Sequence, residues 1–283
     1  MKPAPFRLET PHLTIEGFSR AGHETCFRIR ELGIALDIGR CPDFLIATPN
    51  VLISHAHLDH AAGIPFYAGQ RHLQRLQGGR VIVPSETIDD FRELMRIHER
   101  LERVAYDIEL VPASVDEALP LGRTHRIRAH RATHRVEARA YEVIELRHHL
   151  RPEFAGRDGR EIAALRSHGA TVAEDYERSL LFYTGDTDRG ILEQNAALFR
   201  AEVLMIECSF VGDSHHDRAA KYRHLHFDDI AEFAGQFENE LIVLTHFSRR
   251  YSPAEIVSSI RRRAPAVLLD RLRLVLPPEY QRV

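Results

Sequence analysis

Short apolar runs, many of them β-branched or alternating with polar residues, recur along the chain and are bounded by Gly, Pro, Asn or Asp. Runs of this kind are typical of β-strands. They predict strands at residues 7–15, 25–29, 34–38, 51–54, 80–84, 107–112, 125–129, 139–146, 180–184, 203–207, 241–245 and 272–276. The predicted strands are therefore spread over both halves of the chain.

Segments with helical spacing lie between these strands and predict helices at residues 60–77, 85–103, 227–236 and 253–263. Ser85 and Pro253 suit the first turn of their helices. Strands in both halves with helices between them predict an α/β fold, a sandwich of two sheets with helices outside. Because the chain has no internal repeat and no low-complexity linker, we expect a single domain over residues 1–283.

One polar stretch, residues 147–178, interrupts this pattern and is broken by Pro152, Gly156, Gly159 and Gly169. Prolines and glycines at such intervals mark breaks in regular structure. The stretch is predicted to leave the core as an excursion, with a short helix near residues 158–168. The alternative is an ordinary surface insertion.

Composition limits the class of protein. A chain of 283 residues with 44% apolar residues is able to bury a large core. No apolar run approaches the roughly 18 residues that cross a bilayer, and the first residues lack an apolar signal segment, so we expect a soluble, cytoplasmic protein. Three cysteines without CxxC spacing argue against a disulfide framework or a zinc ribbon. Cys208 is expected to be a buried thiol.

The formal net charge of −3 excludes an overall basic surface of the kind that binds nucleic acid. The distribution of charge is less even than the sum, because residues 123–151 contain eight arginines and three glutamates. This stretch is either a local basic surface or a set of solvent-facing strand residues.

The clearest chemical signal is SHAHLDHAAG, directly after the apolar residues 51–53. It places His55, His57, Asp59 and His60 within six positions. At the end of a strand, His55 and His57 can bind one metal ion while Asp59 and His60 bind a second. Imidazole nitrogen with carboxylate oxygen suits zinc, with manganese or iron as substitutes.

Three further candidate ligands follow predicted strands. Asp186 lies in YTGDTD, His246 in LTHFSRRY and His134 in RATHRVEARAYEV. His125 and His130 compete with His134, because they lie close to it in the sequence. Two metals about 3.5–4 Å apart activate a shared hydroxide for attack on phosphorus. Neither a GxSxG elbow nor a GxxxxGK loop is present, which argues against two other classes of hydrolase.

The motifs HAHLDH, YTGDT and HFSRRY together resemble the ribonuclease Z branch of the metallo-β-lactamase superfamily. GHETC, LDIGRCP and RHLHFDDIAEFA make the chain similar to the short, plant-type members of that branch. The resemblance implies an αββα sandwich with a short protruding arm at residues 147–178, two Zn²⁺ ions per chain (or Mn²⁺ or Fe²⁺) and a homodimer. The chain departs from the common pattern in RHLH and IECS, where GHST-like and HEAT-like runs are frequent.

The resemblance also implies a role for each matching residue. His55, His57 and His134 would hold one zinc ion, Asp59, His60 and His246 the other, and Asp186 would bridge them. Asp59 would also orient the attacking water. His224 would donate a proton to the leaving oxygen, and Glu207 would orient His224.

The activity implied is removal of the 3′ trailer from precursor tRNA. Arg147, His148, His149 and Arg151 would contact the tRNA backbone, and Arg249 and Arg250 the phosphates near the cut. A small-substrate phosphodiesterase acting on a cyclic nucleotide or similar diester is the alternative with the same metals. A non-catalytic RNA-binding module is a third interpretation, against which the complete ligand set argues.

Overall fold

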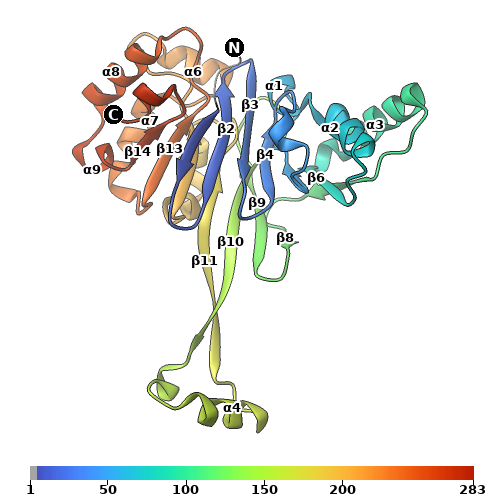
Figure 1. Cartoon of the computed structure of the whole chain (residues 1–283). Helices are drawn as coiled ribbons and strands as arrows, with labels where there is room; N and C mark the ends of the chain where they lie inside the picture. The colour runs from blue at the N-terminus through green and yellow to red at the C-terminus, as the bar shows by residue number, and fades with distance from the viewer. Residues whose placement is uncertain (1–4) are drawn as a thin grey trace.

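The computed structural model describes residues 5–283, which form two seven-stranded sheets packed face to face (Figure 1). In the first sheet the strands follow one another in chain order. They are β1 (Phe6–Glu9), β2 (Thr14–Arg20), β3 (Glu24–Ile29), β4 (Ile34–Ile38), β5 (Asn50–Leu52), β6 (Gly79–Pro84) and β7 (Ile108–Ala113). The β1–β4 pairs are antiparallel and the β4–β7 pairs are parallel.

The second sheet also follows chain order and contains β8 (Ala118–Leu121), β9 (His125–Ala132), β10 (Ala138–Leu150), β11 (Ala173–Tyr183), β12 (Val203–Glu207), β13 (Leu241–Thr245) and β14 (Leu272–Leu274). Its β11–β14 pairs are parallel. Strands that run parallel deliver the loops after them to one edge of a sheet, which is where a shared site forms.

Helices cover both outer faces (Figure 1). Those beside the first sheet are α1 (Leu58–Ala61), α2 (Ile64–Leu73) and α3 (Ile88–Glu102). Those beside the second sheet are α5 (Gly190–Gln194), α6 (His216–Tyr222), α7 (Phe227–Glu232), α8 (Pro253–Arg263) and α9 (Ala266–Leu269). Short 3₁₀ turns lie at Asp43–Leu45, Ser85–Thr87, Pro152–Phe154, Ala196–Phe199, Ala234–Gln236 and Pro278–Tyr280.

Buried strands supply side chains to two apolar layers at once. In β12, Val203 and Met205 pack in the cluster between the sheets, whereas Leu204 and Ile206 pack in the cluster under the helices. Successive side chains of a strand point to opposite faces, so an unbroken apolar run is what a doubly covered strand requires. This arrangement confirms the predicted α/β sandwich with helices outside.

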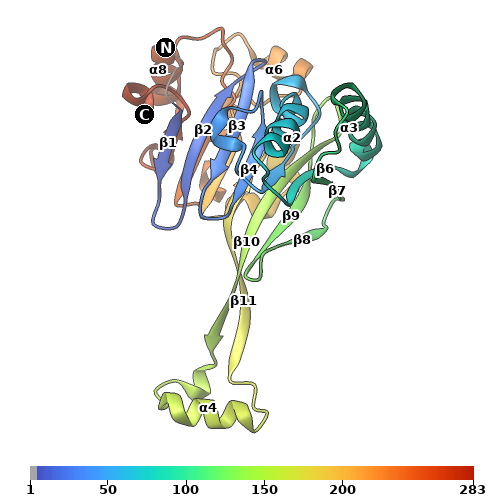
Figure 2. The same cartoon turned by 45° about the vertical axis from the view of Figure 1, so that its right-hand side comes forward.

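The excursion at residues 147–178 is a two-stranded arm, because β10 and β11 continue out of the sheet together (Figures 1 and 2). Their register runs from Tyr141–Tyr183 to Leu150–Ala173. The tip carries α4 (Gly159–Ser167), where the Asp158 side chain accepts a hydrogen bond from the Arg160 N–H at 2.8 Å. The predicted protruding arm and its short helix are confirmed, but its flanks are regular strands and not irregular chain.

Several predicted boundaries were wrong for local reasons. Residues 7–15 form a hairpin and not one strand, since the Thr10 side chain accepts from the Leu13 N–H at 2.9 Å and closes a turn. The helix at 60–77 is two helices that break at Gly63, where a Cβ would come within 2.6 Å of the Cys41 nitrogen. Strand β8 and helix α6 had no counterpart in the prediction. Among the described residues, no helix has the length and apolar character to span a bilayer.

Candidate metal centre

The candidate ligands meet at the edge of the sandwich where parallel strands end. His55 lies just beyond β5, Asp186 beyond β11 and His246 directly after β13. His134 reaches the same place from the loop between β9 and β10. Ala138, the first residue of β10, forms an isolated β-bridge with His55. The fold therefore brings residues 191 positions apart in the chain, from 55 to 246, to one point.

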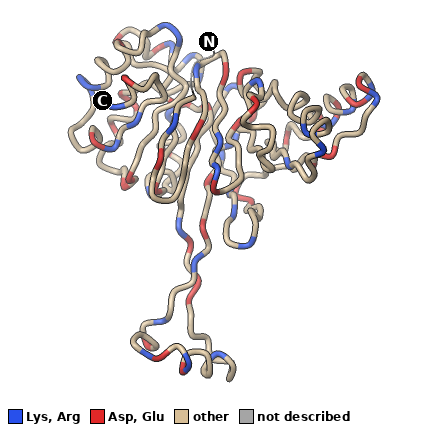
Figure 3. The backbone as a smooth tube through the Cα atoms, in the orientation of Figure 1, with Lys and Arg blue, Asp and Glu red and all other residues tan. Residues whose placement is uncertain are grey.

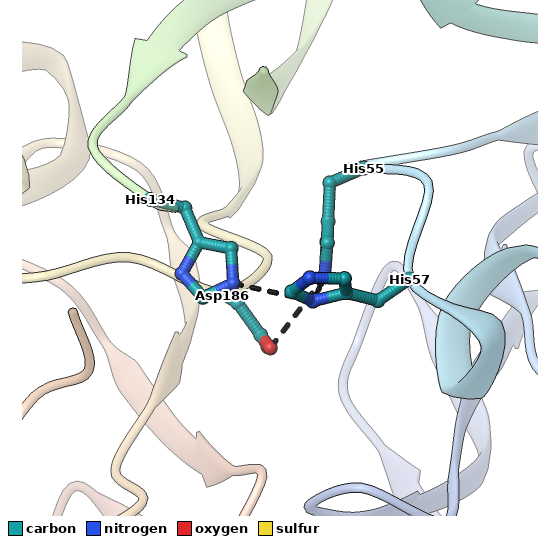
Figure 4. A group of neighbouring side chains, drawn as sticks. All are labelled: His55, His57, His134 and Asp186. Atoms are coloured by element: carbon teal, nitrogen blue, oxygen red, sulfur yellow. Dashed lines mark hydrogen bonds and ion pairs between the residues drawn. The ribbon is translucent and has the colours of Figure 1, made fainter. Parts of the chain in front are cut away.

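One group consists of His55, His57, His134 and Asp186, whose ligand atoms all lie within 4.8 Å of one another (Figure 4). His55 Nε2 is 3.0 Å from His57 Nδ1, and His134 Nε2 is 3.4 Å from the same atom. Asp186 Oδ2 lies 3.7 Å from His55 Nε2. These nitrogens and oxygens surround a space suited to one cation.

A second group consists of Asp59, His60 and His246. Asp59 Oδ2 lies 3.6 Å from both His60 Nε2 and His246 Nε2. Asp186 connects the two groups, because its Oδ1 is 3.4 Å from His60 Nε2 and its Oδ2 is 3.3 Å from His246 Nε2. The carboxylate of Asp186 thus faces both candidate positions.

Four of the histidines have their Nδ1 atoms engaged away from the centre. Nδ1 of His55 donates to Ser54 Oγ at 3.0 Å, that of His60 to Asp37 Oδ2 at 2.7 Å, that of His134 to the Arg223 carbonyl at 3.0 Å and that of His246 to Ser209 Oγ at 2.9 Å. A proton on Nδ1 leaves Nε2 unprotonated, with a lone pair that can bind a metal ion. Partners of this kind fix the ring and its tautomer at metal sites.

Two observations show that these residues fit metal ions. Asp186 Oδ1 is buried and has no hydrogen-bond partner among the described residues. Buried polar atoms are normally satisfied, so a carboxylate oxygen without a hydrogen-bond partner among imidazoles fits the role of a cation ligand. Burial also lowers the pKa values of His55, His57 and His134, which keeps them in the neutral form that binds metal.

His224 lies beside the centre and is held by a buried carboxylate. Its Nδ1 donates to Glu207 Oε1 at 2.7 Å, and its ring is stacked on that of His246 with centroids 5.3 Å apart. Burial opposes a charge on His224, but the attraction and hydrogen bond of Glu207 outweigh it and raise its pKa to about 9. His224 is therefore protonated at neutral pH, as a proton donor must be.

Asp37 is a residue of this centre that the sequence analysis missed as a site residue, although it lies in the LDIGRCP motif. It is fully buried and accepts from the Ser54 N–H and Oγ–H, His60 Nδ1 and the Tyr183 hydroxyl, at 2.6–2.8 Å. It orients His60 directly and His55 through Ser54. Its signals in the sequence were its place in that motif and its position as an aspartate within the apolar run at residues 34–38.

The position of Asp37 gives a testable expectation. Asp37→Asn removes the charge that orients His60, so metal affinity should fall by about 10–100-fold. Competition with a fluorescent chelator measures this change. Asp43→Asn, a substitution at an exposed aspartate in the same segment, is the matched control and should leave the affinity unchanged. Equal affinities for both variants would contradict the assigned role.

Other candidates from the sequence lie apart from the candidate metal centre. His130 is buried on β9 against Glu142, with 2.9 Å between His130 Nε2 and the carboxylate, and His125 lies at the start of the same strand. His134 is thus the histidine of the three that reaches the centre. Arg250 is exposed and lines the cavity over the candidate metal centre, whereas Arg249 is exposed beside it.

The four arm residues are far from the candidate metal centre and are paired with acidic residues. Arg147 contacts Glu145 at 2.6 Å, His149 contacts Glu174 at 3.6 Å and Arg151 contacts Glu174 at 3.2 Å. His148 is bonded to Asp175. Residues 147–178 contain six arginines and six acidic residues, and both signs alternate along the arm in Figure 3. The arm is therefore not a uniformly basic surface.

Another histidine pair does not make a metal site. His216 and His226 lie near Asp228, with 3.8 Å between ring centroids. However, His226 Nδ1 accepts from the Asp228 N–H and its Nε2 donates to the Gly212 carbonyl, while Arg263 is paired with both Asp228 oxygens. No free ligand atom remains on His226, so the cluster is a structural network.

Comparisons with known proteins show the family of the chain. Residues 46–247 match the family model described as beta-lactamase superfamily domain. The chain is 34% identical to tRNase Z TRZ1 of Arabidopsis thaliana, over 87% of this chain and 89% of that protein. It is 32% identical to the chloroplastic tRNase Z TRZ2 of the same plant, over 89% of this chain and 72% of that protein.

Solved structures show the same fold. The short form of human tRNase Z superposes with a TM-score of 0.59 at 19% identity and covers 83% of this chain and 92% of that one. The metallo-beta-lactamase fold protein YhfI from Bacillus subtilis superposes with a TM-score of 0.64 at 14% identity, covering 92% and 94%. By fold and by sequence, the chain belongs to the beta-lactamase superfamily and, within it, to the tRNase Z family.

Proposed function

We propose that the protein is a zinc-dependent endoribonuclease that removes the 3′ trailer of precursor tRNA. The observation that carries the proposal is the pair of ligand groups joined by Asp186, with the Glu207-bound His224 beside them. The relatives named tRNase Z support tRNA as the substrate class. A cytoplasmic location is also part of the proposal. One of the two plant relatives is named as chloroplastic.

Each residue has a part in the proposed reaction. His55, His57 and His134 would hold one Zn²⁺, Asp59, His60 and His246 the second, and Asp186 both. Two zinc ions at such a site supply a hydroxide nucleophile and neutralise charge on the phosphoryl oxygens. Asp59, fixed by the Gly22 N–H at 2.8 Å, accepts a hydrogen bond from the attacking water. His224 donates its Nε2 proton to the departing 3′-oxygen of the tRNA, while Glu207 keeps the ring in place.

The cavity over the metals fits a phosphodiester strand. It has a volume of about 270 Å³, and its lining includes Arg135, Tyr222, His224, Ser248 and Arg250. Guanidinium groups match phosphate oxygens in shape and charge. Arg250 is thus suited to a phosphate next to the cut, and Arg249 to the one beyond it.

The proposal is tested by comparing two substrates, a precursor tRNA and bis-p-nitrophenyl phosphate, at several salt concentrations. A polyanion should lose binding steeply with salt, with a slope of about −0.7 to −0.9 per phosphate contact. Cleavage of the tRNA at the trailer junction with a salt-dependent KM supports the proposal. Hydrolysis of the small diester alone, without salt dependence, would contradict it.

The second candidate, a small-diester phosphodiesterase, is favoured by one observation. The arm carries as many acidic residues as arginines, so it offers no strong attraction to a polyanion as a whole. The arm residues then decide between the candidates, because a small diester bound at the metals does not reach them.

Changing the charge of the arm in both directions should change tRNA processing in both directions. Replacing Arg147, His148, His149 and Arg151 with Ala leaves their acidic partners unpaired, so KM for precursor tRNA should rise roughly tenfold. Replacing the partners Glu174 and Asp175 with Gln and Asn should lower KM instead. Steady-state kinetics measures both, and bis-p-nitrophenyl phosphate hydrolysis should not change. If the KM for precursor tRNA were unchanged in both sets of variants, the small-diester enzyme would be favoured.

We also propose that the protein is a homodimer. Leu58, Phe66, Leu73 and Leu101, on α1–α3, are 79%, 51%, 72% and 73% exposed. Apolar side chains gathered on one side of a chain are typical of a contact surface, and a twofold contact uses the same surface twice. Light scattering should show a dimer for the wild type and a monomer for Leu73→Glu with Leu101→Glu. A monomeric wild type would contradict the proposal.

A further inference from the structure

A second cavity, of about 410 Å³, lies next to the cavity over the metals. It opens between β2 and the segment after β13, and its far wall is the chain after β14. Ser248 lines both cavities, and it follows the metal-centre residue His246 by two positions. The two cavities are therefore adjacent at Ser248.

The second cavity has mostly apolar walls, with two exposed arginines in its lining. Its walls include Phe247, Tyr251 and Leu276, while the exposed Arg20 and Arg249 lie on its lining. The Tyr251 hydroxyl is bonded to His215 and to the Gly212 N–H, which turns it away from the cavity contents and leaves the ring as a wall. Aromatic and apolar walls with cations in the lining are suited to a planar base that carries a phosphate.

The residues that line the metal cavity differ in their relation to this second cavity. Arg135, Tyr222 and His224 are not part of its lining, whereas Ser248 is. In the proposed reaction His224 faces the leaving 3′-oxygen, which belongs to the tRNA. The strand on the other side of the scissile phosphate, the trailer, then runs along Ser248 towards the second cavity.

We propose that this cavity binds one nucleobase of the trailer, within the first three nucleotides after the cut, by stacking on its aromatic wall while Arg20 and Arg249 contact the flanking phosphates. The inference rests on the proposed endoribonuclease function and adds a base-binding site to it. Stacking tolerates any base, because every base has a flat face. The site would therefore hold the trailer without restricting its sequence.

Abasic substitutions in the trailer test this site. Precursor tRNAs with an abasic nucleotide at the first, second or third trailer position are compared with the intact RNA. Loss of the stacked base should raise KM roughly tenfold at one of these positions and leave kcat nearly unchanged. Equal KM values at all three positions would overturn the inference. Failure of the wild type to cut the intact RNA would overturn the proposed function as well, so the two failures are distinguishable.

A variant that fills the cavity makes the test specific. Leu276→Trp should raise KM for the intact RNA and abolish the difference between intact and abasic RNA, while Leu276→Met, of similar volume, should keep it. The ratio is measured on one preparation, so a loss of active protein does not affect it. Persistence of the ratio in Leu276→Trp would overturn the inference.

Crosslinking gives a second readout that does not depend on a variant. A 5-iodouridine at the sensitive position should crosslink under ultraviolet light to Tyr251 or Phe247 of the wild type. A crosslink to Tyr222 or His224 would place the base elsewhere and overturn the inference.

The variant Leu276→Trp has one further outcome that would overturn the inference. If it changed the oligomeric state of the protein and left KM for the RNA unchanged, the cavity would be assigned to a second copy of the chain.

Discussion

Replacing Asp186 with Ala should leave the purified protein without its full complement of metal and reduce phosphodiester hydrolysis by more than about 10³-fold. Asp186 faces both ligand groups, with its two oxygens 3.3–3.7 Å from three imidazole nitrogens. Its loss removes the one carboxylate that both positions share. Metal ions at such sites contribute several kcal/mol of charge stabilisation, and each 1.36 kcal/mol is a factor of ten in rate.

Elemental analysis and turnover of bis-p-nitrophenyl phosphate measure the two effects of Asp186→Ala. The matched control is Asp188→Ala, in the same loop, whose carboxylate accepts from the Gly190 N–H at 2.9 Å and belongs to neither ligand group. The control should keep about two metals per chain, as expected of a two-metal centre. Full metal content in Asp186→Ala would contradict the bridging role.

His224→Ala should lower kcat for precursor tRNA by about 10²–10⁴-fold while metal content stays normal. The reason is that a ribose 3′-oxygen is a poor leaving group without a proton. A p-nitrophenolate leaves without one, so hydrolysis of bis-p-nitrophenyl phosphate should fall much less. This difference between the two substrates separates a proton donor from a metal ligand, whose loss would slow both reactions.

His216→Ala, a substitution at an exposed histidine of α6, is a suitable control and should leave both substrates unaffected. Glu207→Gln should resemble a milder form of His224→Ala, because the ring keeps a hydrogen-bond partner but loses the charge that raises its pKa. Equal slowing of both substrates in His224→Ala, together with loss of metal, would show that His224 is a ligand.

The residues at the metal centre were predictable because each follows a strand that the sequence makes plain. An apolar run such as residues 51–53 predicts a buried strand. Polar residues directly after such a run are expected at the end of the strand, and therefore at the edge of the sheet. The partners of these residues were not predictable in the same way. Asp37 and Ser209 act through bonds to residues 23 and 37 positions away, and spacing along the chain says nothing of such contacts.

The strands of the arm were missed for a different physical reason. Alternation of apolar and polar residues marks a strand only when one face is buried. His148, His149 and Leu150 on β10 and Glu174, Asp175 and Tyr176 on β11 are all exposed. Because both faces of the β10–β11 pair are in contact with water, its sequence shows no alternation of apolar and polar residues. The stretch therefore resembles irregular polar chain in the sequence.

The same lack of cover sets how the arm behaves in time. Beyond Leu146, β10 pairs with β11 alone among the described residues, and a two-stranded ribbon is marginally stable in water. Ribbons of this kind open and close locally without unfolding the domain. Backbone amides should therefore exchange with solvent faster towards α4 than at Tyr141. A ligand that binds the arm has to offset the conformational entropy that the arm loses. The edge that holds the candidate metal centre is fixed by two buried sheets and does not share this motion, so the arm and the centre can move on separate timescales.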